Sequence, residues 1–386
     1  MRSERDYGNR VGIWRLMGVL DRYGIRACVA LNGGVLLVAC RGGASGRRVM
    51  GRSAGAPPAY RRSRWDTRSP NAIAFAIATL LLFAPAAGAA ETVMAGGVSS
   101  GSTNLWPIHI GIRKGFFQAA GINVDLVFAQ SNASVIQQVA ANSINVSVGS
   151  GLVDPIRAVE KGAPVALIRI ETQRPPYALL AKPALKSIAD LKGKTVSVGG
   201  PKDITRIFFE RMLAPSGVPS RDVDLIFAGA TSARIAALQS GAADAALLTT
   251  PYNFHAETAG YRNLGMTADM VDMPFSGVSI NRNWASRNMK TAQAYLAVYS
   301  KAILWLEDPT NRREATDIML AVSSLKPEDV EKSYDFLRGG HFFETTGTIS
   351  RARLGKVLEA LQELGDIPPT MPVDSLFMPG LTQVSD

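Results

Sequence analysis

The sequence predicts an α/β protein made of two similar lobes. One short unit occurs twice, at 137–150 (QQVAANSINVSVGS) and at 236–249 (AALQSGAADAALLT); each copy runs from the end of an apolar helix through a small-residue corner into a short apolar strand. Strands and helices alternate along most of the chain, and a proline pair interrupts this alternation at Pro175-Pro176. Because ligands bind beyond the carboxyl ends of strands in open α/β sheets, two facing lobes predict a cleft lined from both sides. A duplication without a ligand is the alternative.

The formal net charge of +10 comes from the N-terminal segment alone. Residues 1–90 contain fourteen Arg, no Lys and four acidic residues, whereas 91–386 contains 28 basic and 28 acidic residues. A protein that binds nucleic acid needs a basic footprint on its folded part, and a balanced composition does not supply one. The charge distribution therefore excludes nucleic acid as a partner.

A secretory signal peptide is predicted at the end of this basic segment. Arginines up to Arg68 precede an apolar run at 71–84, and the small-residue series Ala87-Gly88-Ala89 follows it. The run is shorter than the ~20 residues that a helix needs to cross a bilayer. We expect cleavage after Ala89 or Ala90 and a mature protein in the periplasm. A membrane anchor retained in the mature protein is the alternative.

Residues 1–89 are thus expected to be a leader, and 1–60 are expected to lie upstream of the true translation start, for which Met50 is a candidate. Other interpretations are a lipoprotein acylation site ending at Cys40 and a twin-arginine signal at Arg61-Arg62. The only two cysteines of the sequence lie in this leader. The mature chain therefore has no disulfide, and no thiolate for catalysis or metal binding.

The first lobe is expected to comprise 90–175 together with 277–386. Its elements follow from short apolar runs that alternate with helical segments, which predicts a parallel sheet. Gly115 fits the position after a helix, where positive φ is easiest without a Cβ, and Ser131 or Asn132 is placed to cap the next helix. The expected strands are 91–96, 123–129, 146–148 and 165–170, and the expected helices are 105–114, 133–141 and 154–161.

The second lobe is expected to comprise 176–276. Pro175-Pro176 forces extended backbone and marks the first crossing between the lobes, and the chain crosses back near 271–278. Asp203 is the predicted N-cap of a helix. The expected strands are 177–182, 195–198, 223–227 and 243–248, and the expected helices are 204–213 and 232–239. Four helices are expected after the return to the first lobe, at 291–306, 311–322, 326–337 and 350–364.

No catalytic or metal-binding motif is found in the sequence. His109, His255 and His341 are scattered, and none has a His or acidic partner at metal-ligand spacing. Gly199-Gly200 resembles a phosphate loop superficially but lacks the Lys-Ser/Thr ending, and no HExxH or G-x-S-x-G motif occurs. The sequence therefore predicts neither an enzyme nor a cofactor or metal.

Loops rich in small polar residues follow five of the expected strands and precede helices. At such corners, free backbone N–H groups and the helix dipole favour anions or polar head groups. N-capping without a ligand is the alternative for any one of these loops, but their recurrence favours a ligand site with aromatic walls. The predicted ligand-binding residues are Ser102, Trp106, Ser131, Asn132, Gly149, Ser150, Tyr177, Gly200, Thr205, Thr250 and Tyr252.

Several segments resemble the nitrate/sulfonate/taurine class of ABC-transporter substrate-binding proteins, which includes relatives for thiamine pyrimidine precursors. They are WPIHIGIRKGFFQAAGINVDLVFA at 106–129, SINVSVGS at 143–150, SIADLKGKTVSVGG at 187–200 and RIAALQSGAADAALL at 234–248. The likeness covers roughly 91–287. It implies a bilobed periplasmic-binding-protein type II fold, a ligand held between the lobes, no catalysis, and delivery of the ligand by a monomer to a membrane permease with its ATPase.

The chain departs from this class at two points. The second repeated unit has the usual Gly241 and Asp244, whereas the first has Ser143 and Asn145 in their places. The chain also shows no well-placed cleft arginine of the kind typical of tight sulfonate or nitrate sites, for which Arg174 and Arg206 are only candidates. The expected ligand is accordingly a small anion or a polar-headed organic molecule. The alternatives are an enzyme similar to pyrimidine-precursor synthases, which use a cysteine-rich motif, and a sensor or docking module without a transport role.

Overall fold

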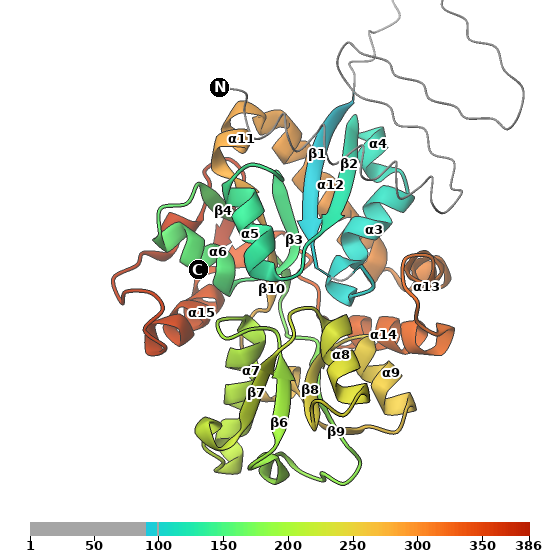
Figure 1. Ribbon diagram of the computed structural model, residues 1–386. Coiled ribbons are helices and arrows are strands. Elements are labelled where there is room, and N and C mark those ends of the chain that lie inside the picture. The colour runs from blue at the N-terminus through green and yellow to red at the C-terminus, as the bar shows by residue number, and fades with distance from the viewer. Residues whose placement is uncertain (1–89, 99) are drawn as a thin grey trace, which may run out of the picture. The chain divides into compact units, whose positions relative to one another are not determined.

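The computed structural model describes residues 90–98 and 100–386, which lie within one compact unit of the chain. The predicted signal peptide, the candidate start at Met50 and both cysteines fall outside the described residues, so these expectations stay predictions. Two five-stranded sheets, each flanked by helices, form two lobes, which Figure 1 shows one above the other.

The sheet of the first lobe has the strand order β2-β1-β3-β10-β4. β1 runs parallel to β2 and β3, whereas β10 runs antiparallel to both β3 and β4. β3 and β4 are buried along their whole length, as expected for strands covered on both faces. The strands are β1 (Glu91–Gly97), β2 (Ile122–Phe128), β3 (Val146–Gly151), β4 (Val165–Thr172) and β10 (Ser276–Asn281).

The sheet of the second lobe repeats this arrangement in the order β7-β6-β8-β5-β9. β6 runs parallel to β7 and β8, and β5 runs antiparallel to β8 and β9. The strands are β5 (Tyr177–Ala181), β6 (Thr195–Val198), β7 (Asp224–Phe227), β8 (Ala245–Thr249) and β9 (Arg262–Met266). A small parallel pair, β11 (Thr348–Ser350) and β12 (Gln383–Ser385), completes the strands of the described residues.

Both sheets are mixed, so the expectation of a parallel sheet in the first lobe is wrong. β5 and β10 are the first strands after the chain crosses between the lobes. β5 begins at Tyr177 and β10 directly after Phe275, and both of these residues lie between the lobes. The parallel strands end at the cleft instead. A strand that enters its lobe from the crossing therefore pairs antiparallel with them.

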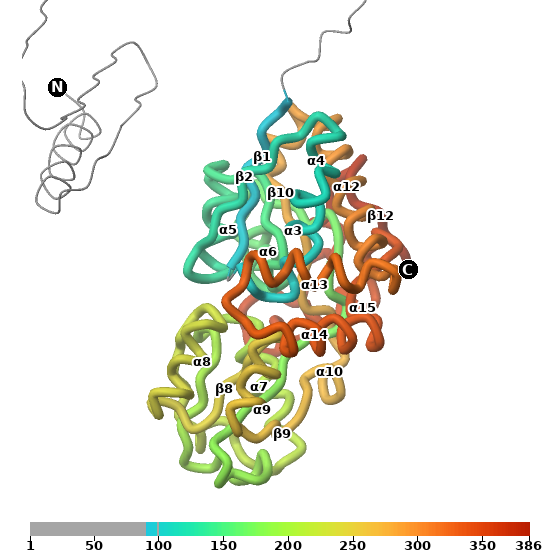
Figure 2. Tube along the Cα trace, turned by 90° about the vertical axis from the view of Figure 1, so that its right-hand side faces the viewer, coloured from blue at the N-terminus to red at the C-terminus, as the bar shows by residue number. Residues whose placement is uncertain are grey.

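Helices cover both sheets, and the C-terminal ones also reach the second lobe. α14 lies against α9 in Figure 2, and His255 of α9 contacts Asp329 of α14 with 3.3 Å between Nδ1 and Oδ2. The helices up to the return crossing are α3 (Trp106–Arg113), α4 (Phe116–Ala119), α5 (Asn132–Ala140), α6 (Val153–Glu160), α7 (Ile204–Leu213), α8 (Thr231–Gln239), α9 (Tyr252–Thr258) and α10 (Thr267–Met270). Those after it are α11 (Arg282–Arg287), α12 (Met289–Glu307), α13 (Arg312–Leu320), α14 (Pro327–Gly339) and α15 (Arg351–Glu363).

The repeated unit extends over a whole strand-helix-strand motif. The motif β2-α5-β3 aligns without a gap with the motif β7-α8-β8. The segment VDLVFAQSN at 124–132 matches VDLIFAGAT at 223–231, and the two motifs occupy equivalent positions in their sheets. Phe128 corresponds to Phe227, and Val135 corresponds to Arg234. Gly241 corresponds to Asn142 and not to Ser143 as expected, and both residues take the left-handed conformation, with φ of 81° and 56°. The two lobes therefore present equivalent corners to each other across the cleft.

The departure at Asn145 has a structural explanation. Asn145 Oδ1 accepts a hydrogen bond from the backbone N–H of Met94 at 2.8 Å, and Asp244 Oδ2 accepts one from Thr195 N–H at 3.1 Å. The two side chains thus accept equivalent backbone hydrogen bonds, directly before the second strand of each repeated motif. Asp244 also pairs with Lys182 at 2.7 Å, whereas Asn145 is 8% exposed. A neutral amide avoids burying an unpaired charge there.

Candidate functional site

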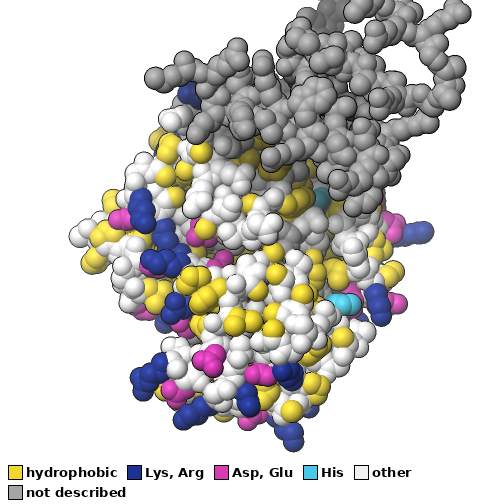
Figure 3. Space-filling model, viewed as in Figure 1, with side chains coloured by type: hydrophobic (Ala, Val, Ile, Leu, Met, Phe, Trp, Pro, Cys, Tyr) yellow, Lys and Arg dark blue, Asp and Glu magenta, His cyan; other side chains and the backbone are white. Residues whose placement is uncertain are grey.

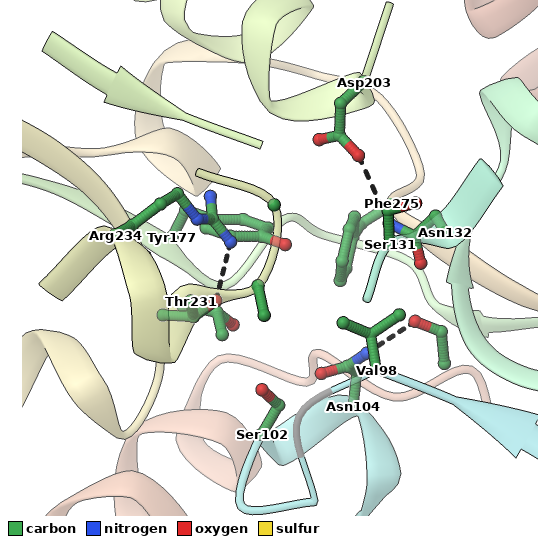
Figure 4. Close-up of a pocket in the computed structure, with 14 residues that line it drawn as sticks. Val98, Ser102, Asn104, Ser131, Asn132, Tyr177, Asp203, Thr231, Arg234 and Phe275 are labelled. Atoms are coloured by element: carbon green, nitrogen blue, oxygen red, sulfur yellow. Dashed lines mark hydrogen bonds between the residues drawn. The ribbon is translucent and has the colours of Figure 1, made fainter. Parts of the chain in front are cut away.

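A cavity lies between the two lobes, where the carboxyl ends of the parallel strands face each other (Figure 4). Its volume is about 30 Å³, and one water molecule needs roughly 10–15 Å³ on the same scale. The lobes are thus nearly closed on one another. The lining residues are Val98, Ser102, Asn104, Ser131, Asn132 and Gly149 from the first lobe, Tyr177, Asp203, Gly229, Ala230, Thr231, Arg234 and Thr249 from the second, and Phe275 beside the return crossing.

Arg234 is the cation of this cavity. It lies on α8, its side chain is almost fully buried, and its Nη2 donates to Thr231 Oγ1 at 2.6 Å. Within the described part of the chain, Nε and Nη1 have no hydrogen-bond partner, and no carboxylate pairs with the guanidinium. A buried charge is costly unless it is paired. The free edge of Arg234 is therefore suited to an anion that enters the cavity.

The start of α8 adds backbone donors beside this guanidinium. Ala230, its N-cap, makes no side-chain capping hydrogen bond, whereas the equivalent helix α5 is capped by Ser131, whose side chain accepts from Ser134 N–H at 3.3 Å. The first N–H groups of a helix have no partner within it and carry a partial positive charge. Ala230 and Thr231 line the cavity, so the uncapped end of α8 faces the same space as Arg234.

Aromatic rings form the wall next to Arg234. The guanidinium carbon lies 5.4 Å from the centre of the Tyr177 ring, and Phe275 meets that ring edge-on at 5.0 Å. Burial raises the pKa of Tyr177 to about 12, and the nearby positive charge of Arg234 opposes this rise. Tyr177 therefore stays a neutral phenol, and the rings provide an apolar surface for the body of a ligand.

The opposite wall carries a carboxylate. Asp203 caps α7 by accepting from Thr205 N–H at 2.9 Å and from Thr205 Oγ1 at 2.5 Å. Its other oxygen accepts from Asn132 Nδ2 of the first lobe at 3.4 Å, and Figure 4 shows this contact across the cavity from Arg234. The cavity thus has a cation on one side and an acceptor-rich carboxylate on the other.

Gly149 forms the third corner of the cavity. Its φ is +62°, and a Cβ at this position would lie 2.6 Å from Asn104 Nδ2 and 2.8 Å from Leu105 Cδ2, so only glycine fits. Its carbonyl accepts from Asn104 Nδ2 at 2.5 Å, and its N–H donates to Glu171 Oε2 at 2.8 Å. Buried groups on both sides therefore fix the backbone that faces the cavity.

The structure brings five of the eleven predicted residues to the cavity wall: Ser102, Ser131, Asn132, Gly149 and Tyr177. Trp106 is placed elsewhere, since it is 1% exposed and stacks on Tyr334 within the first lobe. Ser150 and Gly200 do not line the cavity either. Thr205 binds Asp203 and Gly199 N–H and so supports the wall from behind.

Thr250 and Tyr252 lie at the contact between the lobes. The Thr250 carbonyl accepts from Thr103 N–H at 3.1 Å and from Thr103 Oγ1 at 2.8 Å. A Cβ on Gly101 would lie 3.2 Å from the Tyr252 hydroxyl oxygen, so this ring packs against the first lobe beside the same contact. These two residues therefore join the lobes at the rim and do not face the cavity.

The cavity arginine was not among the sequence candidates. Arg174 donates to the carbonyl groups of Gly340 and Ala268, and Arg206 pairs with Glu210 at 2.8 Å; neither lines the cavity. The repeat holds the signal that identifies Arg234, because its counterpart Val135 is a fully buried core residue. The other core positions of the two helices match, with Ile136 opposite Ile235 and Val139 opposite Leu238, so a charged residue in place of a core valine indicates a special role. The other lining residues outside the prediction are Val98, Asn104, Asp203, Gly229, Ala230, Thr231, Thr249 and Phe275.

Nothing in the described residues points to metal binding or to a membrane span. No group of three or more His, Cys, Asp or Glu side chains in this part of the chain is placed to hold a metal ion, and none of its helices is long and apolar enough to cross a bilayer. His109 Nε2–H donates to the Ser100 carbonyl oxygen at 3.0 Å, and burial lowers the pKa of the imidazole to about 4. On the face in Figure 3, the described basic and acidic side chains are interspersed.

This architecture, with two mixed five-stranded sheets facing each other across a cavity, is the periplasmic-binding-protein fold. The model of the NMT1/THI5-like family matches residues 102–311, which is more than half of the chain, so the chain belongs to this family. The resemblance to nitrate- and sulfonate-binding proteins and the expected fold are thereby confirmed.

The chain is similar to the nitrate/nitrite binding protein NrtA of Synechococcus elongatus, with 26% identity over 258 residues, which is 56% of this chain and 55% of that protein. It thus spans little more than half the length of this relative. The alkanesulfonate-binding protein SsuA of Xanthomonas axonopodis pv. citri, solved with MOPS bound, has the same fold with a TM-score of 0.63 and 17% identity, over 74% of this chain and 98% of that one. The periplasmic nitrate-binding protein NrtA of Synechocystis PCC 6803 has a TM-score of 0.61 and 17% identity, over 74% and 84%.

Proposed function

We propose that this chain is a solute-binding protein that captures a small anion, or an organic molecule with an anionic head, and delivers it to an ABC importer. The observation that carries this proposal is Arg234, a buried guanidinium whose free nitrogens line a cavity between two lobes. A structural arginine in the same place would need a carboxylate partner to offset its burial. The relatives named above, which bind nitrate or alkanesulfonate, support the same class of ligand.

The head group is expected to accept hydrogen bonds from Arg234 and from the uncapped start of α8. The body of the ligand would pack on Tyr177 and Phe275. Asp203 faces the cavity from the other side, so a hydrogen-bond donor on the ligand is favoured there and a second negative charge is disfavoured. The described part of the chain has 28 acidic residues against 28 basic ones, so ligand selection depends on these local groups and not on a long-range field.

Binding is expected to involve rotation of the lobes about the two crossings, at 173–176 and 271–275. We assign 90–175 and 277–386 to the first lobe and 176–276 to the second. The cavity is too small for a sulfonate-sized ligand to enter without opening. Contacts that join the lobes, such as Thr103 with Thr250 and Asn132 with Asp203, would form on closure. This is hinge closure around a ligand, and the closed form is the one that a permease would accept.

Catalysis is not part of this proposal. None of the three histidines lines the cavity, and 41–386 contains no cysteine to serve the cysteine-rich motif of the pyrimidine-precursor synthases. A location in the periplasm agrees with the predicted signal peptide and with the Synechocystis relative, which is named a periplasmic protein. A permease and its ATPase encoded beside this gene would favour transport over a sensor role.

A thermal-shift screen tests the proposal. The panel comprises nitrate, methanesulfonate, longer alkanesulfonates and aromatic carboxylates, with uncharged pyrimidines and nucleobases as the neutral arm. A ligand at a hundredfold excess over its Kd stabilises by roughly 2.7 kcal/mol, which raises Tm by several degrees in a chain of this size. We expect hits among the anions. Hits confined to the neutral arm would contradict the proposal.

A further inference from the structure

Glu171 lies directly behind the cavity wall, at the end of β4. It is fully buried, its Oε2 accepts from the N–H of Gly149 at 2.8 Å, and its Oε1 accepts from the Tyr299 hydroxyl at 2.5 Å. Gly149 faces the cavity and its carbonyl holds Asn104, which also lines it. One backbone residue thus separates this carboxyl group from the space where the ligand is proposed to bind.

The groups around Glu171 offset the cost of ionising this buried carboxyl group only in part. Burial raises its pKa to about 8, and the hydrogen bonds from Tyr299 and Gly149 and the charge of Arg169 oppose the rise only in part. Arg169 is itself engaged by Ser300 and by the carbonyl and carboxylate of Glu344. Tyr295 is the remaining titratable side chain nearby, and burial keeps it neutral. β3 and β10 contribute no charged residue on this side.

We infer that Glu171 is a positioning residue that also sets the electrostatic potential of the cavity, and that anion binding is coupled to protonation of its carboxyl group. This inference rests on the proposed function. In the protonated state the carboxyl group holds Gly149 in place without adding charge. In the ionised state a negative charge lies behind the wall and repels an anion across a medium of low polarity.

The coupling has a definite sign and size. With a pKa of about 8, Glu171 is almost entirely protonated at pH 6 and about one-tenth protonated at pH 9. When one protonation state alone is competent, the apparent Kd equals the intrinsic Kd divided by the competent fraction. The Kd for an anion is therefore expected to be about tenfold higher at pH 9 than at pH 6.

Two substitutions separate this role from a merely structural one. In Glu171→Gln, the amide oxygen can accept from Gly149 N–H and the amide N–H can donate to Tyr299, so the variant imitates the protonated carboxyl group at every pH. In Tyr299→Phe, the ionised carboxylate loses a hydrogen-bond donor, which raises the pKa of Glu171 further. The first variant should abolish the pH dependence, and the second should move it to higher pH.

The test measures the Kd of methanesulfonate by calorimetry at half-unit steps from pH 6 to pH 9.5. This probe remains a monoanion over the whole range, so any change comes from the protein. We expect a ratio of Kd at pH 9 to Kd at pH 6 of about ten for the wild type and about one for Glu171→Gln. For Tyr299→Phe, the midpoint of the rise should shift upward, and this measurement decides the question if the glutamine variant does not fold.

Glu307→Gln is the matched control. Burial raises the pKa of this carboxyl group to about 7, and its side chain does not line the cavity. The variant should keep the tenfold ratio. A pH profile of Glu171→Gln that parallels the wild type would overturn the inference, as would a profile abolished by Glu307→Gln. If methanesulfonate fails to bind any form at pH 6, the proposed anion site is contradicted, and the inference that rests on it is contradicted as well.

Discussion

Replacing Arg234 by methionine should change ligand binding and stability in opposite directions. Methionine fills a similar apolar volume against Tyr177 but removes the buried charge and its free N–H groups. A hydrogen bond to a charged group contributes about 1.5–3 kcal/mol. Because two guanidinium nitrogens lack partners in the ligand-free cavity, loss of at least about 3 kcal/mol of binding energy is expected, or roughly a hundredfold in Kd.

The ligand-free protein should become more stable with the same substitution. Arg234 is 3% exposed, and its one hydrogen-bond partner in the described part of the chain is Thr231. Replacement of poorly compensated buried charges by apolar residues of similar volume is often stabilising by about 1–4 kcal/mol. We therefore expect the free energy of unfolding to rise by about 1–2 kcal/mol in the absence of ligand.

Urea denaturation without ligand and calorimetric titration with the tightest anion of the panel measure the two effects. Arg206→Met is the control, because Arg206 is partly exposed, pairs with Glu210 on the surface of α7 and lies outside the cavity. Both of its effects should stay within about 0.5 kcal/mol. Unchanged binding in Arg234→Met would place the ligand elsewhere. A loss of ligand-free stability would show that the arginine has a structural role.

Three further results are expected. Gly149→Ala should lower both affinity and stability by more than about 1 kcal/mol, because its Cβ would meet Asn104 at 2.6 Å; calorimetry and denaturation would detect this, and a neutral effect would contradict the described corner. The free energy of unfolding should fall as pH rises from about 5 to 8. Because the folded-state pKa of Glu171 is raised to about 8, the stabilisation from its protonated form is complete below the unfolded-state pKa of a glutamate and is lost as the pH rises through about 8. A free energy of unfolding that does not change with pH in the wild type would refute this. The radius of gyration from small-angle scattering should decrease when the anion is added, and no change at saturation would argue against closure of the lobes.

Local sequence patterns were sufficient to predict most of the helices and strands near the cavity. The helix at 204–213 begins and ends where predicted, because Asp203 caps it with a side-chain hydrogen bond to Thr205 N–H. The strand at 195–198 is also as predicted, since a short β-branched run ends at Gly199-Gly200. The fold class was predicted from the repeat, because a duplicated α/β unit can be recognised in the sequence without knowledge of contacts between distant segments.

The parts that were wrong or missed depend on contacts between distant segments. The antiparallel direction of β5 and β10 follows from the path of the chain between the lobes, which no local pattern encodes. Trp106 was expected at the ligand, but Tyr334, far along the chain, covers its ring. The short elements α4, α9, α10, α11, β9, β11 and β12 were not predicted, since runs of three to seven residues carry little periodicity.

Arg234 shows why the site was predicted less well than the fold. From the sequence of its helix alone, Arg234 is expected to be an exposed charged residue. Its burial results from packing against Tyr177 on another element. Comparison with Val135 in the repeat identifies it, but only when the two motifs are aligned over their full length. At this position a buried valine of one copy is replaced by a buried arginine in the other.

A crystal structure with the tightest anion of the panel would locate the ligand. We expect the anionic group to lie within hydrogen-bond distance of Arg234 Nε and Nη1, next to the start of α8, with residues of both lobes in contact with the ligand. An anion bound outside the cavity, or one that touches a single lobe and leaves Arg234 unpaired, would contradict this expectation.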